Sequence, residues 1–281
     1  MIFAVKCNQQ TIRHVCYPSY NNGVNTEKKE DDSLKNGLTE LIFILDRSGS
    51  MSGLEQDTIG GFNSLIEKQK GESGDAIITT VLFDGDYELL HDRIDLKDVK
   101  PITGRDYFVR GTTALLDAIG RSIDKTINVQ KNASEDDRAE NVMFIITTDG
   151  MENASREYRL DKVKAMIEEQ KEKYGWEFLF IGANIDAVET AGSYGISPDH
   201  AVNYSADSHG VKAKYMAMGK AISYTRKSMP ISSNWKDDLE SDDRDKTKKP
   251  DPVKSNVKNE KKKDKKSKSG TILSRLMKRG R

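Results

Sequence analysis

Short apolar segments alternate with segments of helical period along residues 38–228, and this alternation leaves few architectures open to the chain. The strand-like segments are apolar and rich in β-branched and aromatic residues, and they cover residues 39–45, 76–83, 141–148, 176–183 and 200–204. Between them, apolar residues recur at helical spacing in 59–66, 114–129, 158–173, 185–194 and 211–226. Strands alternating with helices predict an α/β fold in which helices cover both faces of a mostly parallel sheet.

One further strand is expected to run against the others. Asp84-Gly85 directly follows the 76–83 segment, and a second strand-like segment occupies 87–91. An Asp-Gly pair between two such segments is a hairpin signal. We therefore expect an open, doubly wound, Rossmann-like sheet that is mostly parallel, with one antiparallel edge strand.

The charges divide the chain, although its 45 Lys+Arg balance its 45 Asp+Glu. Residues 231–281 hold 17 basic and 9 acidic side chains, a net of +8, which leaves a net of −8 for residues 1–230. The Lys-rich stretch has too few large apolar side chains to offset chain entropy, so we expect a disordered basic tail. The expected division is an N-terminal extension and linker at 1–37, a domain at 38–228, and a tail at 229–281 with a short amphipathic end.

Composition also argues against membrane-spanning and conventionally secreted proteins. No stretch approaches the roughly 18 consecutive apolar residues of a membrane helix, and no apolar signal-peptide core follows the start. Two cysteines, Cys7 and Cys16, cannot staple a fold of this size. Their scarcity favours a reducing, cytoplasmic location.

The residues that follow the expected strands carry most of the candidate chemistry, because ligands of such sheets bind at the carboxyl ends of the strands. After the first strand, Asp46, Ser48 and Ser50 occupy alternate positions of a Gly-containing loop. In an extended loop, alternate side chains can face one hard cation.

Two more loops offer oxygen ligands for the same ion. Asp149 precedes Gly150 at the end of the 141–148 strand, and Thr112 and Thr113 precede the 114–129 helix. Two carboxylates, hydroxyl groups and water make an all-oxygen octahedral shell, which suits Mg²⁺ or Mn²⁺.

These three loops, in this order, resemble the metal-ion-dependent adhesion site of the von Willebrand factor A domain family. The likeness covers residues 38–228, and ELIFILDRSGSM, TALLDAI and ITTDGMEN resemble the soluble bacterial branch of that family. Thr113 takes the threonine position in preference to Thr112, because GTTALLDAI then matches the family's G-x-T-x-L pattern best. The ligands implied by the resemblance are Asp46, Ser48, Ser50, Thr113 and Asp149, with Mg²⁺ or Mn²⁺ as the ion.

The resemblance implies a metal-dependent protein–protein interaction module that captures an acidic residue of a partner through the ion. One alternative is a metal-dependent hydrolase of phosphate esters, but neither a general base nor a Lys/Arg cluster accompanies the loops, and Arg47 is the sole nearby cation. We therefore do not expect an enzyme. Another alternative is a stress-related scaffold that binds its partner without metal. The basic tail is either a solvated extension or a weak electrostatic contact for nucleic acid or an anionic membrane.

Other chemistry-bearing residues favour structural roles. The four histidines show no ligand or triad spacing, and His14 with the two cysteines forms an incidental cluster. We interpret 84–86 as a turn, 182–184 as strand-to-helix geometry, and Glu152 and Asn153 as residues that shape the loop after Asp149, with a contact to the metal ligands left open.

Overall fold

The computed structural model describes residues 37–134 and 137–241. The N-terminal extension to residue 36, with Cys7, His14 and Cys16, lies outside the described residues, as do the Lys-rich stretch from 242 onward and its amphipathic end. Within the described ranges, no helix is long and apolar enough to cross a membrane.

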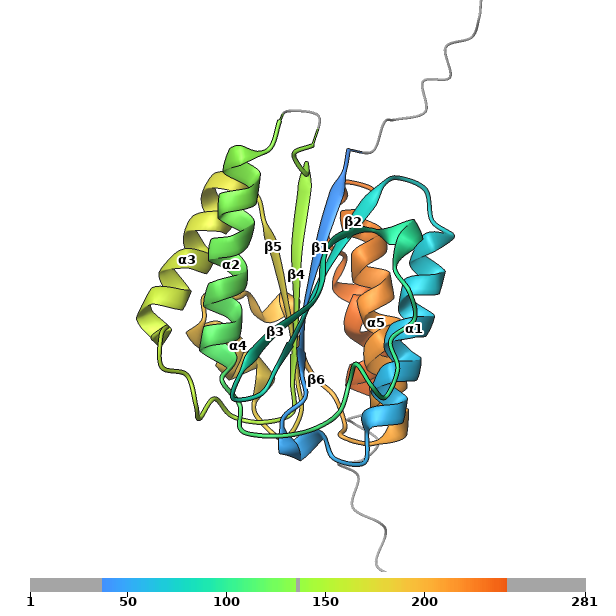
Figure 1. The fold of residues 1–281 in the computed structure, drawn as a ribbon, viewed down its shortest axis with the longest axis vertical. Helices are drawn as coiled ribbons and strands as arrows, with labels where there is room; N and C mark the ends of the chain where they lie inside the picture. The colour runs from blue at the N-terminus through green and yellow to red at the C-terminus, as the bar shows by residue number, and fades with distance from the viewer. Residues whose placement is uncertain (1–36, 135–136, 242–281) are drawn as a thin grey trace, which may run out of the picture.

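Six strands form one mixed sheet in the order β3-β2-β1-β4-β5-β6 (Figure 1). Strand β3 pairs with β2 in antiparallel fashion at one edge, and all other neighbours are parallel. The predicted fold class is confirmed, including the single antiparallel edge strand. The strands are β1 (Thr39–Asp46), β2 (Ala76–Phe83), β3 (Tyr87–Asp95), β4 (Asn141–Thr148), β5 (Glu177–Gly182) and β6 (Ala201–Asn203).

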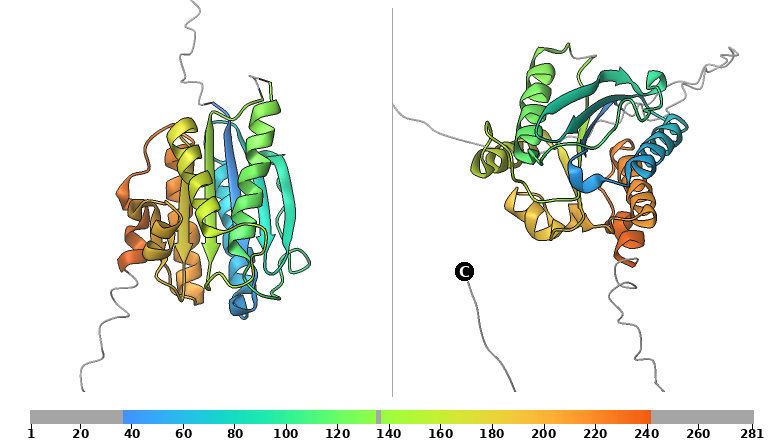
Figure 2. Two further views of the ribbon diagram at one scale, coloured as in Figure 1. Left: turned by 90° about the vertical axis from the view of Figure 1, so that its left-hand side faces the viewer. Right: turned by 60° about the horizontal axis from the view of Figure 1, so that its bottom comes forward.

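Helices cover both faces of the sheet, as Figures 1 and 2 show. Helices α1 (Glu55–Lys70) and α5 (Ser208–Thr225) pack together on one face. The other face carries α2 (Leu115–Asn132), α3 (Leu160–Tyr174) and α4 (Ala187–Ser193). Single turns of 3-10 helix complete the fold at η1 (Gly49–Met51), η2 (Leu96–Asp98), η3 (Pro198–His200) and η4 (Ser233–Lys236).

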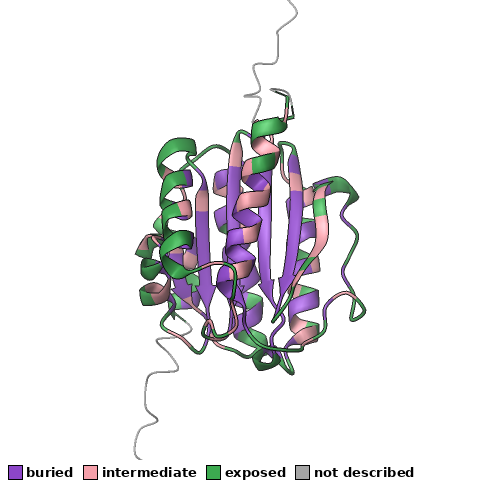
Figure 3. Ribbon diagram, turned by 60° about the vertical axis from the view of Figure 1, so that its left-hand side comes forward, coloured by how far each residue is buried: buried purple, intermediate pink, exposed green. Residues whose placement is uncertain are grey.

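The central strand β1 explains how the two layers are held. All eight of its residues are buried, and Figure 3 shows most of the sheet in purple, the colour of buried residues. Its side chains alternate, so that Phe43 and its neighbours two residues away contact the α1–α5 layer, whereas Ile42 and Ile44 contact the layer of α2. This double burial is the usual environment of a parallel strand between helices.

The chain continues to pack beyond the expected domain boundary at residue 228. Trp235 is fully buried and Leu239 is 1% exposed, both in the core of the α1–α5 layer. The Trp235 indole N–H also donates to the Asp199 carbonyl at 2.8 Å. The boundary was therefore placed too early, because two apolar residues in a polar stretch give no periodic signal.

All parallel strands end at the same edge of the sheet, at the bottom of Figure 1 and toward the viewer in the right-hand view of Figure 2. The loops that leave this edge after β1 and β4 carry the DRSGS and TDG motifs, and the GTT motif lies where the connection from β3 returns to this edge at the start of α2. Topology alone therefore gathers three motifs that are far apart in sequence.

Candidate metal centre

Asp46 is the last residue of β1, and three neighbours fix its position. Its Oδ1 accepts a hydrogen bond from the Ser48 backbone N–H at 2.7 Å, and its Oδ2 accepts one from the Thr148 hydroxyl at 2.7 Å. The Tyr107 hydroxyl donates to the Asp46 carbonyl oxygen at 2.6 Å. Asp46 is only 2% exposed, so its carboxylate is held in a defined place near the end of the sheet.

The two serine hydroxyls join Asp46 to Asp149. Ser48 Oγ lies 3.1 Å from Ser50 Oγ, and the Ser50 hydroxyl donates to Asp149 Oδ1 at 2.5 Å. Neighbouring oxygens around an octahedral Mg²⁺ lie about 3 Å apart, since each metal–oxygen bond is about 2.0–2.1 Å. The Ser48, Ser50 and Asp149 oxygens lie at hydrogen-bond separations that are close to this spacing.

Thr113 faces the same place and is held there by Asn153. The Thr113 N–H donates to Asn153 Oδ1 at 3.0 Å, and the Asn153 N–H donates to the Thr113 carbonyl oxygen at 3.0 Å. A Cβ atom added to Gly150 would lie 3.5 Å from Ser50 Oγ and 3.8 Å from Thr113 Oγ1. Both hydroxyls therefore approach the backbone directly after Asp149.

Thr112 points elsewhere. Its side chain is exposed, and its hydroxyl oxygen lies 3.0 Å from where a Cβ on Gly85 would stand, at the turn after β2. Thr113, by contrast, is 3% exposed. Of the two threonines that the sequence offered, the structure brings Thr113 to the other candidate ligands.

Burial disfavours the charged form of both carboxylates, and one of their four oxygen atoms has no partner. Burial raises the pKa of Asp46 despite the hydrogen bonds from Ser48 and Thr148, and burial also raises the pKa of Asp149 despite the bond from Ser50. Asp149 Oδ2 is buried and has no hydrogen-bond partner. A buried acceptor without a donor is costly, and a divalent cation would satisfy it. The donor set therefore fits Mg²⁺ or Mn²⁺.

Lys214 lies in α5 within electrostatic reach of the centre. The residue is 1% exposed, and its ammonium nitrogen lies 4.4 Å and 5.1 Å from the ring centroids of Tyr204 and Tyr215. Burial lowers the pKa of Lys214 to about 8, although the charges of Asp149 and Asp46 oppose the shift. Sequence reasoning missed this residue, because a lysine in a helical segment is normally solvated.

Arg47 braces the loops and does not join the oxygen cluster. Its side chain is fully buried, with Nε donating to Asp84 Oδ2 at 2.9 Å and Nη1 lying 2.7 Å from Glu88 Oε2. Arg110 Nε donates to the same Asp84 oxygen at 2.7 Å. Burial opposes ionisation of Asp84, but the Arg110 hydrogen bond and the two guanidinium charges hold its pKa below the usual range.

The loop after Asp149 is tied to the start of α2, in agreement with the loop-shaping role expected of Glu152. Its Oε2 accepts from the Leu116 N–H at 2.9 Å, and the Ser155 hydroxyl oxygen accepts from the Asp117 N–H at 3.0 Å. Asn153 does more than shape the loop, since it contacts Thr113 directly.

Two supporting residues were missed by sequence reasoning. Thr148 could have been identified from its position, because it directly precedes Asp149 at the end of a buried strand. Nothing local marked Tyr107, because its contact with Asp46 crosses 61 positions of the chain.

The segments 182–184 and 84–86 have the structural roles that the sequence predicted. A Cβ on Gly182 would meet Ala187 at 2.9 Å, so this glycine permits the close approach of α4. The 84–86 segment forms a turn, with the Asp84 N–H donating to the Asp86 carbonyl at 3.1 Å.

In the described ranges, no three His, Cys, Asp or Glu side chains group as metal ligands. The candidate centre has only two carboxylates and depends on hydroxyl groups for the rest.

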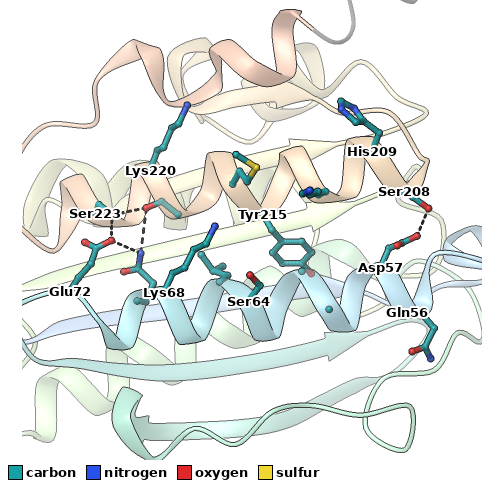
Figure 4. A pocket seen from close by; sticks show the side chains of 17 residues that line it. Gln56, Asp57, Ser64, Lys68, Glu72, Ser208, His209, Tyr215, Lys220 and Ser223 are labelled. Carbon is teal, nitrogen blue, oxygen red and sulfur yellow. Dashed lines mark hydrogen bonds between the residues drawn. The ribbon is translucent and has the colours of Figure 1, made fainter.

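A groove of about 820 Å³ runs between α1 and α5 and is separate from this cluster (Figure 4). Hydrogen bonds bridge the groove at both ends, from Ser208 to Asp57 of α1 at 2.6 Å and from Ser223 to Glu72, just after the end of α1. Lysines and carboxylates both line it. The groove contains none of the five candidate ligands.

Comparisons with known proteins give weak likenesses. No protein-family model matches the chain, and no curated protein matches it. Among solved structures it is similar to a variant of the PilB minor pilin from Streptococcus sanguinis, with 13% identity over 71% of this chain and 65% of that chain and a TM-score of 0.49. It is also similar to proximal thread matrix protein 1 from the mussel byssus with a zinc-occupied MIDAS motif, with 14% identity over 66% and 46% and a TM-score of 0.46.

A third similar structure is the VWA2 paralogue of ArnB from Sulfolobus acidocaldarius, with 18% identity over 66% of this chain and 45% of that chain and a TM-score of 0.42. The chain thus spans between 45% and 65% of the length of these three proteins. Likenesses of this strength do not carry a function across, so the function is inferred from the residues of the centre.

Proposed function

We propose that the protein is a von Willebrand factor A-type interaction module of the soluble bacterial type. Its ion, Mg²⁺ or Mn²⁺, is bound by Asp46, Ser48, Ser50, Thr113 and Asp149, and it captures an acidic residue of a partner protein. The observation that supports this most directly is the gathering of two buried carboxylates and three hydroxyls near the ends of β1 and β4, where one carboxylate oxygen, Asp149 Oδ2, is buried without a hydrogen-bond partner.

The charge of the centre explains why an acidic partner is favoured. Two carboxylates balance a divalent ion, and the remaining protein ligands are neutral hydroxyls. When bound, the ion offers a Lewis-acidic position that an incoming carboxylate can occupy in place of water. Ser50 and Gly49 are exposed, so a partner can approach from their side. Thr148 and Asn153 keep the carboxylate of Asp46 and the backbone of Thr113 in place during that approach.

Hydrolysis of phosphate esters is a weaker proposal. A phosphate would need a free cation, and Arg47 is fully buried and engaged with Asp84 and Glu88. We propose a binding role without catalysis, in the cytoplasm. A scaffold that works without metal is a separate outcome, which the following experiment distinguishes.

The test measures thermal unfolding with and without Mg²⁺ or Mn²⁺. A ligand that binds only the folded state at about tenfold above its Kd adds about 1.4 kcal/mol, or about 3–6 °C in Tm for a domain of this size. Asp46→Ala should abolish that rise relative to its own metal-free Tm. The control is Asp92→Ala. Asp92 is an exposed residue of β3 that pairs with Lys125 of α2, and this variant should keep the rise in Tm.

The partner is then sought by capture from lysate in Mg²⁺ and again in chelator. Binding should disappear in chelator, return with Mg²⁺, and be competed by acetate at high concentration. No calorimetric heat and no stabilisation at millimolar metal would contradict metal binding. A partner bound equally in chelator and by Asp46→Ala would indicate the metal-independent scaffold.

A further inference from the structure

We propose that Met151 and Phe108 form an apolar rim beside the metal centre, and that this rim selects partner segments carrying an apolar side chain within two residues of the captured acid. The inference rests on the proposed metal-bridged capture and names the chemistry that its partner needs. Both side chains are strongly exposed for their type, at 75% for Met151 and 43% for Phe108.

Met151 stands next to the centre by covalent geometry. It follows Asp149 and Gly150, so its Cα lies within about 7 Å of the Asp149 Cα. The loop beneath it is anchored, because the Asn184 side-chain amide donates to the Asp149 carbonyl at 3.3 Å and Asn153 pairs with Thr113 on the other side. An exposed thioether on an anchored loop can adapt its shape to an incoming apolar group.

Phe108 is held at the other side of the DRSGS loop. Two guanidinium groups lie near its ring, with the Cζ atoms of Arg47 and Arg110 at 5.5 Å and 5.6 Å from the ring centroid. Both arginines donate to Asp84 Oδ2, which fixes the positions of the two guanidinium groups. Cation–π contacts of this kind orient the ring without burying its outer face.

Backbone hydrogen bonds place the Phe108 segment alongside the metal loop. The Arg110 N–H donates to the Arg47 carbonyl at 2.9 Å, and the Gly49 N–H donates to the Gly111 carbonyl at 3.3 Å. The Ser50–Asp149 hydrogen bond joins the same loop to the Met151 side. The segments that carry Phe108 and Met151 are therefore both neighbours of the loop that carries the exposed Ser50.

This arrangement fits an extended acidic segment of a partner protein. A carboxylate directed at the ion leaves the side chains one and two residues away in reach of the rim, since residues in an extended chain advance about 3.3 Å each. An apolar or aromatic side chain there removes exposed apolar surface on both partners. A serine at those positions gains nothing from the rim.

The test uses the full chain with ¹³C-methyl methionine and three blocked peptides in Mg²⁺. The peptides are acetyl-Gly-Phe-Asp-Phe-Gly-amide, its analogue with Ser for both Phe, and its analogue with Asn for Asp. We expect the Phe–Asp peptide to bind at least fivefold tighter than the Ser–Asp peptide and to shift the methyl signal lost in Met151→Ser. The Asn peptide should not bind.

Variants separate the rim from the metal. Met151→Ser and Phe108→Ser should each bring the ratio of the two affinities close to one while leaving Ser–Asp binding unchanged. Met229→Ser is the matched control, because Met229 is 51% exposed and lies near the start of β4, at the opposite edge of the sheet. It should keep the full preference.

The inference that the rim selects apolar neighbours fails in the following cases. Equal affinities of the two acidic peptides for the natural chain, or a preference that survives in Met151→Ser and Phe108→Ser, would show that the rim does not select. If acetate and the Ser–Asp peptide bind in Mg²⁺ but Phe adds nothing, only this inference fails. If acetate and all peptides fail to bind, or bind equally in chelator, the proposed function fails with it.

Discussion

Lys214 shows at the scale of a single residue how the interior near the metal centre is balanced. Its ammonium group is surrounded by the rings of Tyr204 and Tyr215 and attracted by Asp149 and Asp46. Burial disfavours the charged lysine and also disfavours the charged carboxylates. The opposite charges partly compensate one another across the interior, so each depends on the others for its ionisation state.

This environment predicts a pH dependence of stability. Lys214 falls from the ordinary value of 10.5 to a pKa of about 8 in the folded state. Between these two values the unfolded chain binds more protons than the folded one, so the free energy of unfolding rises with pH. Relative to Lys214→Met, the natural chain should gain about 2 kcal/mol between pH 8 and 9.5, as measured by urea unfolding.

The buried tyrosines do not interfere in that window, because burial raises the pKa values of Tyr204 and Tyr215 above the ordinary value of 10. They remain protonated in the folded chain and mostly protonated in the unfolded chain up to pH 9.5, and the comparison with Lys214→Met cancels what they contribute. Parallel stability profiles for the natural chain and Lys214→Met would show that Lys214 is not ionised in the way described here.

At the scale of elements, the 3-10 turn η4 extends the α1–α5 layer beyond α5. Trp235 is the largest fully buried side chain of the described residues, and its indole bonds to the Asp199 carbonyl beside β6. Lys236 reinforces the same contact, donating to the Pro198 and Ala201 carbonyls at 2.9 and 3.2 Å. The segment therefore closes the edge of the sheet at its last and shortest strand.

Removing the anchor should cost much of the domain's stability. Trp235→Ala leaves a large cavity and an unpaired carbonyl, and the expected loss is about 3–5 kcal/mol in the free energy of unfolding. Met229→Ala, at a half-exposed methionine in the same connection, should change it by no more than about 0.5 kcal/mol. Similar denaturation midpoints for the two variants would mean that Trp235 does not belong to the cooperative core.

At the scale of the whole molecule, the hydrophobic layers and the loops at the ends of the strands have different roles. The layers on the two faces of the sheet hold the strands, and the loops at the carboxyl edge of the sheet carry the candidate ligands. Because these ligands lie on three connections, the centre depends on the complete sheet and not on any one segment.

A fragment of residues 37–241 should therefore keep both stability and metal response. Both hydrophobic clusters that the described residues form lie within this range, whereas the sequence of residues 242–281 is too Lys-rich and apolar-poor to form a core of its own. We expect its Tm to lie within a few degrees of that of the full chain by calorimetry, with the same shift in Mg²⁺. A Tm lower by ten degrees would place part of the core outside the fragment.

Sequence by itself determined the order and type of the elements and the positions of the three motif loops. Apolar runs and helical spacing are local signals, and the Asp84-Gly85 turn identified the antiparallel edge strand from residues that are adjacent in the chain. The parallel topology then required the ends of β1 and β4 to lie at the same edge. For this reason Asp46, Ser50 and Asp149 could be brought together by reasoning alone.

Only the tertiary structure decided which groups complete and support the centre. Ser50 bonds to a residue 99 positions away, and Thr148 bonds to one 102 positions away. Contacts over such separations depend on strand register and side-chain rotamers, which leave no periodic trace in the chain. The burial of Lys214 and Trp235 is decided in the same way, because a side chain becomes buried through what packs over it from distant elements.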